Sequence, residues 1–82
     1  MYSLFAEVVQ VVYTAHVEVN VRRLRALRRK RVLSLRELGE RADVSKDTLS
    51  RIERTGTAYP STIRKIAKAL DVEPSELVPD EE

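Results

Sequence analysis

The stretch SLRELGERADVSKDTLSRIERTG, residues 34–56, decides the fold, because it encodes two short helices separated by a very tight turn. Ser34 and Glu37 have the spacing of a capping box, in which each side chain caps the backbone amide of the other residue at a helix start. Ser45 is an N-cap residue that starts the second helix only a few residues later. Asp43 tolerates the left-handed backbone that such a turn requires. The stretch therefore predicts a sharp helical corner.

Apolar residues recur at helical spacing within this corner and on both sides of it. Intervals of three and four are the pattern of helices that bury one face. The positions predicted to be buried in this way are Val21, Leu24, Leu27, Leu35, Leu38, Ala42, Leu49, Ile52, Ile63, Ile66, Ala67 and Leu70. Gly39 is a poor helix former, so its place inside a helix predicts that another helix crosses closely there. The chain is expected to be all-α, with five helices that begin near Asn20, Ser34, Ser45, Ser61 and Pro74.

The N-terminal segment follows a different period. Residues 9–21 alternate between apolar odd positions and even positions that are polar apart from Val12, which is typical of a strand. Residues 2–12 fit a helical stripe equally well. A lone strand leaves its backbone unpaired, and no second strand is apparent in the sequence, so we expect two chains to pair antiparallel across a two-fold axis. A loosely ordered tail or a packed helix is the alternative. The residues expected in the dimer are Val9, Val11, Tyr13, Val17 and Val19.

The charges are strongly segregated along the 82 residues, a length suited to one domain. All 15 Lys and Arg lie within residues 20–70 against five acids, while residues 71–82 hold six acids and no base. A basic segment of this kind favours nucleic acid as the partner, and a solvated basic face without a partner is the plainer alternative. We divide the chain into an N-terminal extension (1–19), a folded domain (20–78) and an acidic tail (79–82).

Several classes of protein are disfavoured by what the sequence lacks. There is no cysteine and only one histidine, so no metal site is expected. We find no nucleophile–base pair and no phosphate loop, since Gly39 and Gly56 are the only glycines, which argues against an enzyme, a cofactor or a small-molecule substrate. No apolar run is long enough to cross a bilayer. The expectation is a cytoplasmic protein.

The residues from Leu24 to Gly56 and from Pro60 to Val78 resemble the lambda-repressor-like (Cro-type, or XRE) helix-turn-helix family. The resemblance is carried by Leu38, Ala42, Val44-Ser45, Leu49-Ser50-Arg51-Ile52-Glu53 and the run from Lys65 to Leu70. It implies a sequence-specific transcriptional regulator, most simply a repressor, that binds a palindromic operator as a homodimer and places the helix Ser45–Glu53 in the major groove. The alternative is an antitoxin or another protein-interaction module that binds DNA while its N-terminal segment holds a partner protein.

The resemblance also implies roles for individual residues. Base edges would be contacted by Lys46, Asp47, Ser50 and Arg51. The DNA backbone would be contacted by Ser34, Arg36, Thr48, Arg54, Thr55, Gly56 and Thr57, and Arg28 and Glu53 match a structural ion pair. Leu35 stands where the family often has a glutamine, and Asp43 replaces the usual turn glycine. Because the loop after the second helix is less basic than in many relatives, phosphate contacts are also open to Arg22, Arg25 or Arg29.

Overall fold

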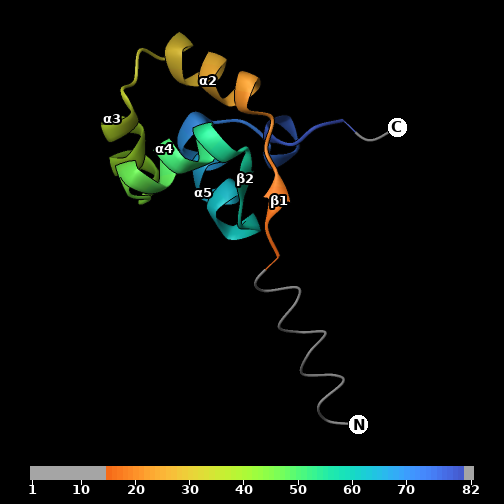
Figure 1. The fold of residues 1–82 in the computed structure, drawn as a ribbon. Helices are drawn as coiled ribbons and strands as arrows, with labels where there is room; N and C mark the ends of the chain where they lie inside the picture. Colours follow the sequence, from red (N-terminus) through yellow and green to blue (C-terminus); the bar gives the residue numbers. More distant parts are fainter. Residues whose placement is uncertain (1–14, 81–82) are drawn as a thin grey trace, which may run out of the picture.

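A computed structural model describes residues 15–80, and Figure 1 shows its helices gathered around a common centre. The elements in chain order are β1 (Val17–Glu18), α2 (Val21–Lys30), α3 (Leu35–Ala42), α4 (Lys46–Thr55), β2 (Thr57–Ala58), α5 (Pro60–Leu70) and the 3₁₀ helix η1 (Pro74–Leu77). None of these helices is long and apolar enough to cross a membrane. The predicted helical corner corresponds to α3 and α4.

Three of the four α-helices in the described residues start directly after the residues that the sequence predicts as caps. The Asn20 side chain accepts a hydrogen bond from the Arg23 amide at 3.0 Å, and α2 follows. Ser34 opens α3 with the full capping box, and the Ser45 hydroxyl accepts from the Thr48 amide at 3.1 Å to open α4. α5 has no side-chain cap and instead starts with a proline, which suits the first helical position because it has no amide to satisfy.

The helical stripes meet in a single core. All of the positions predicted from helical spacing are buried except Val21 and Leu35, which are partly buried and pack against the core. Four further core residues lie outside the helical stripes, in connections, in β2 or in the 3₁₀ helix: Val19, Leu33, Ala58 and Leu77. Apolar burial is the main source of stability of such a domain.

The expected count of five α-helices is wrong. The described residues form four α-helices, and the segment from Pro74 to Leu77 is a 3₁₀ helix. Its amide at Glu76 donates to the Glu73 carbonyl at 2.9 Å, which is an i to i+3 bond. Pro74 and Pro79 bracket the segment, so it is too short for consecutive α-helical bonds, and short pieces of this kind adopt the tighter helix.

The expectation that the chain has no second strand is also wrong. β1 pairs antiparallel with β2, with Val17 opposite Ala58, and the Val19 amide donates to the Gly56 carbonyl at 2.8 Å. Val19 is buried in the chain's own core and is therefore not exposed for a dimer contact, whereas Val17 packs against that core and stays partly exposed. A two-residue strand between Gly56 and Tyr59 is too short to show a period. Val9, Val11 and Tyr13 lie outside the described residues.

The turn between α2 and α3 carries local strain that a substitution should relieve. Val32 has φ +56° and is 84 % exposed, and the amides of Val32 and Leu33 donate to the carbonyls of Arg29 and Arg28. This pattern of bonds is a helix end that prefers glycine at the left-handed position. A β-branched residue there is strained, and its side chain gains little because it packs against almost nothing.

We therefore expect Val32→Gly to stabilise the domain by about 1 kcal/mol and to raise Tm by about 5 °C. Thermal unfolding followed by circular dichroism measures the change. Ala26→Gly is the matched control, because Ala26 is exposed in the middle of α2 and glycine there should cost up to about 1 kcal/mol. A Val32→Gly protein no more stable than the parent would show that the turn holds no relievable strain.

Candidate nucleic-acid interface

The turn between α3 and α4 is held by a very close backbone approach. Asp43 ends α3 in the left-handed conformation, with φ 59° and ψ 45°, as the sequence predicts. The Val44 amide then donates to the Gly39 carbonyl at 2.9 Å. A Cβ atom on Gly39 would lie only 2.5 Å from the Val44 carbonyl oxygen. The expectation of a helix crossing closely at Gly39 is corrected in one respect: the close approach is present, but the carbonyl of the turn makes it, and the nearest atoms of α4 would lie 3.5 Å from the added Cβ.

α4 presents one face to the core and the opposite face to solvent. Leu49 and Ile52 are fully buried and fix the helix against the domain. Helical geometry of 3.6 residues per turn places the other side of α4 away from them. Of the four residues expected at base edges, three are exposed and Ser50 is partly exposed: Lys46, Asp47, Ser50 and Arg51. These side chains form a polar surface on a rigid helix.

The hydroxyl groups of Ser45, Thr48 and Thr55 differ in whether their hydrogens are already used in hydrogen bonds within the domain. The Ser45 hydroxyl donates to Thr48 Oγ1 at 2.8 Å, which leaves the Thr48 hydroxyl hydrogen free to point outward. The Thr55 hydroxyl instead donates to the Arg51 carbonyl at 2.9 Å, within its own helix. A phosphate oxygen needs a donor. Thr48 can supply one without breaking a bond, whereas Thr55 cannot.

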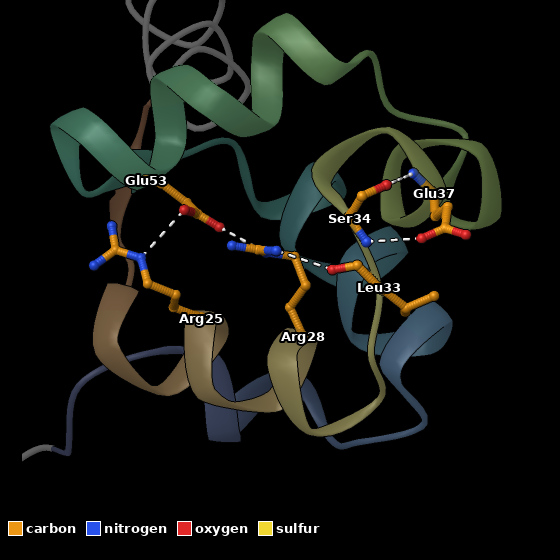
Figure 2. Close-up of polar contacts among 6 residues, drawn as sticks. All are labelled: Arg25, Arg28, Leu33, Ser34, Glu37 and Glu53. Carbon is orange, nitrogen blue, oxygen red and sulfur yellow. Dashed lines mark hydrogen bonds and ion pairs between the residues drawn. The ribbon is translucent and has the colours of Figure 1, made fainter.

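The start of α3 offers backbone amides to an anion, although not the amide of Ser34. That amide donates to Glu37 Oε1 at 2.9 Å, and the Glu37 amide donates to the Ser34 hydroxyl at 3.0 Å (Figure 2). The bond from the Ser34 amide, together with that from its hydroxyl, holds the pKa of Glu37 below its usual value. The amides of Leu35 and Arg36 lie in the first turn, where no intrahelical acceptor is available. They are the groups best placed to meet a phosphate.

Glu53 is held between two arginines of α2 and does not face solvent freely (Figure 2). Arg28 Nε lies 3.1 Å from Glu53 Oε2, and Arg28 Nη1 donates to the Leu33 carbonyl at 2.9 Å. Arg25 Nε lies 3.2 Å from the other carboxylate oxygen, Oε1. The side chains of Arg28 and Glu53 are 13 % and 11 % exposed. The pair expected from the resemblance is thus present, and it fastens α4 to α2.

The described geometry consists of two helices joined by this turn, and the second helix has a polar face. A comparison with known protein families supports it. The family profile of a helix-turn-helix domain matches residues 21–79. The chain belongs to the helix-turn-helix domain family. This membership is consistent with the resemblance to XRE-like DNA-binding proteins, and it points to a DNA-binding regulator rather than an enzyme. No curated protein and no solved structure matches the chain.

Sequence reasoning on this helix-turn-helix protein missed one member of the ion cluster. The sequence leaves Arg25 open as a phosphate contact together with Arg22 and Arg29, and the structure adds a bond from its Nε to Glu53. A signal was available, because Arg25 and Arg28 are three residues apart and therefore neighbours on one helix. Both can reach the same carboxylate, which the sequence assigned to Arg28 alone.

Other chemistry is sparse in the described part of the helix-turn-helix domain. Between residues 15 and 80, no three His, Cys, Asp or Glu side chains are grouped so that they could hold a metal ion. His16 stacks on Tyr59 with ring centroids 4.2 Å apart, so the lone histidine braces β1 against the start of α5. The polar surface of α4 is therefore the candidate functional site.

Proposed function

We propose that this helix-turn-helix protein is a sequence-specific transcriptional regulator that inserts α4 into the major groove of DNA. It acts as a homodimer and represses by occupying a palindromic operator. The observation that carries the proposal is the exposed face of α4, where Asp47, Ser50 and Arg51 stand on a helix fixed by Leu49 and Ile52. Rigid presentation of a few polar side chains is what base recognition in the major groove requires.

The side chains on this face have distinct roles in the proposed complex. Arg51 donates two hydrogen bonds to a guanine, and Asp47 accepts one from the amino group of a cytosine. Lys46 donates to guanine acceptors. Leu35 stands where the family often has a glutamine that braces this position, so the Lys46 side chain has less support here than in those relatives. Ser50 contacts a base edge between them.

Backbone contacts surround this face and fix its position on the duplex. The proposed contacting residues are Arg36, Thr48, Arg54, Gly56 and Thr57. Ser34 and Thr55 are left out, because the Ser34 amide and the Thr55 hydroxyl already donate within the domain. The hydroxyl of Thr48 and the first-turn amide of Arg36 are the donors best prepared for a phosphate. Contacts of this kind supply affinity and orientation without reading the base sequence. The residues proposed for the homodimer contact are Val9, Val11 and Tyr13, which lie outside the described residues.

Selection of bound sites from random duplex DNA, with the full chain, tests this function. We expect a two-fold symmetric consensus with half-sites about 34 Å apart. Arg51→Ala should weaken binding of the selected site by about 10- to 100-fold and should relax the preference for one base pair in each half-site.

Arg64→Ala is the matched control for the loss of one charge. Arg64 is exposed on α5, in a hollow that it shares with Val17 and Pro74 and that excludes the α4 surface. The control should keep both the consensus and most of the affinity. An Arg51→Ala protein that selects the parent consensus with parent affinity would refute the proposed role of α4.

A further inference from the structure

We propose that Arg25 anchors α4 on DNA by binding a backbone phosphate, and that Glu53 holds its guanidinium in place for that contact. This inference rests on the proposed function and names a contact outside α3, α4 and the loop that follows them. It makes Arg25 a phosphate contact and Glu53 a positioning residue.

The first two turns of α2 lie beside the part of the domain that is expected to meet the DNA backbone. The Val19 amide, just before α2, donates to the Gly56 carbonyl at 2.8 Å. A Cβ atom on Gly56 would lie 3.8 Å from Val21 Cγ2. Arg25, one turn later, reaches Glu53 near the end of α4. Arg25 therefore stands next to the segment from Arg54 to Thr57.

The cluster of Arg25, Arg28 and Glu53 has two positive charges and one negative charge, so one positive charge is not neutralised. The bonds and the exposure of the two arginines assign that charge to Arg25. Arg28 is less available than Arg25, because its Nε pairs with Glu53, its Nη1 donates to the Leu33 carbonyl, and its side chain is only 13 % exposed. Arg25 uses only Nε, and its side chain is 40 % exposed. Within residues 15–80, its two terminal nitrogens have no hydrogen-bond acceptor. Those nitrogens are free to donate to phosphate oxygens, which the planar guanidinium suits well.

Glu53 lowers the entropic cost of ordering the Arg25 side chain on a phosphate. A free arginine loses considerable side-chain entropy when a ligand immobilises it. Because Glu53 Oε1 already holds Nε at 3.2 Å, part of that ordering is complete before DNA binds. The carboxylate is itself kept in place by Arg28, so the anchor is built into the core contact between α2 and α4.

The charges on α2 are arranged asymmetrically, in agreement with this role. Arg22 and Arg29 lie within one turn of Arg25 and are exposed, and neither forms an ion pair within the described part of the chain. Arg23, on another side of the helix, is neutralised by Glu76 at 2.7 Å. Arg22, Arg25 and Arg29 therefore form a positive stripe along one side of α2, whereas the side that faces η1 is neutralised.

The salt dependence of binding to the selected operator tests the anchor. We expect Arg25→Gln to weaken binding about tenfold and to lower the slope of log K against log salt by about 0.9, the share of one phosphate contact. The selected consensus should not change. Arg25→Lys should retain the slope and recover only part of the affinity, because lysine keeps the charge but lacks the fork that spans carboxylate and phosphate.

Arg23→Gln is the matched control, since it removes the same charge from an exposed position of the same helix. It should leave the slope unchanged. An Arg25→Gln protein with the parent slope, or an equal fall in slope for Arg23→Gln, would overturn the anchor. A changed consensus for Arg25→Gln would also overturn it, because a phosphate contact carries no base information. If the parent protein itself shows no selective, salt-dependent binding, the proposed function fails rather than the anchor.

Discussion

Replacing Glu53 with alanine is expected to destabilise the domain by about 3 kcal/mol, because it leaves Arg28 with an uncompensated charge in a mostly buried place. Arg28 is only 13 % exposed and keeps a single bond, to the Leu33 carbonyl. Arg25 loses its partner as well, but water reaches its more exposed side chain. Since a domain of this size has a stability of only about 5–15 kcal/mol, the loss is a large share of the total.

Urea unfolding measures this change, with the midpoint and the slope of the transition recorded separately. Glu76→Ala is the control, because it breaks the ion pair with Arg23 whose two side chains are 48 % and 39 % exposed. Exposed pairs contribute little, so the control should keep the parent midpoint. Glu53→Gln should fall between the two, since its amide oxygen still accepts from one arginine. Equal midpoints for Glu53→Ala and Glu76→Ala would disprove a structural role for the cluster.

Gly39→Ala is expected to destabilise the domain by about 2–3 kcal/mol, although alanine is the better helix former by about 1 kcal/mol. The added Cβ would lie 2.5 Å from the Val44 carbonyl oxygen, which is a backbone atom and cannot rotate away. Relief of that contact requires the turn to shift, and α4 starts directly after the turn. The substitution should therefore weaken DNA binding as well as stability.

Unfolding and operator binding should be measured on the same Gly39→Ala preparation, with Gly56→Ala beside it. Gly56 has φ +77°, so alanine there should cost about 1 kcal/mol from the backbone alone. The nearest atom to its added Cβ is 3.8 Å away, which leaves room. If Gly39→Ala proves as stable as the parent, the close approach of the turn does not constrain this domain.

Local signals in the sequence were sufficient for most of the helical frame. Asn20, Ser34 and Ser45 cap helices because their side-chain oxygens reach amides three residues ahead, a contact that depends only on nearby residues. The left-handed conformation of Asp43 and the buried stripes of the helices likewise depend on residues that lie close together in the sequence. The exposed face of α4 followed from the resemblance, and the helical period supports it.

Tertiary structure alone decided the features that join distant residues. The sequence places Arg25 beside Arg28 on one helix, but it does not show that Arg25 shares the carboxylate of Glu53, 28 positions away, or that Val17 pairs with Ala58. A strand of only two residues, such as β2, is too short to show a period. A charged residue has many possible partners in the sequence, and only packing brings one of them within bonding distance. Val19, which the sequence predicts as a dimer contact, is buried in the chain's own core because its backbone bonds to Gly56. The sequence by itself determined where α2, α3 and α4 start and which face each helix buries, because those signals are local. The packing of α2 against α4 determined which arginines share the carboxylate of Glu53, because that contact joins residues far apart in the chain.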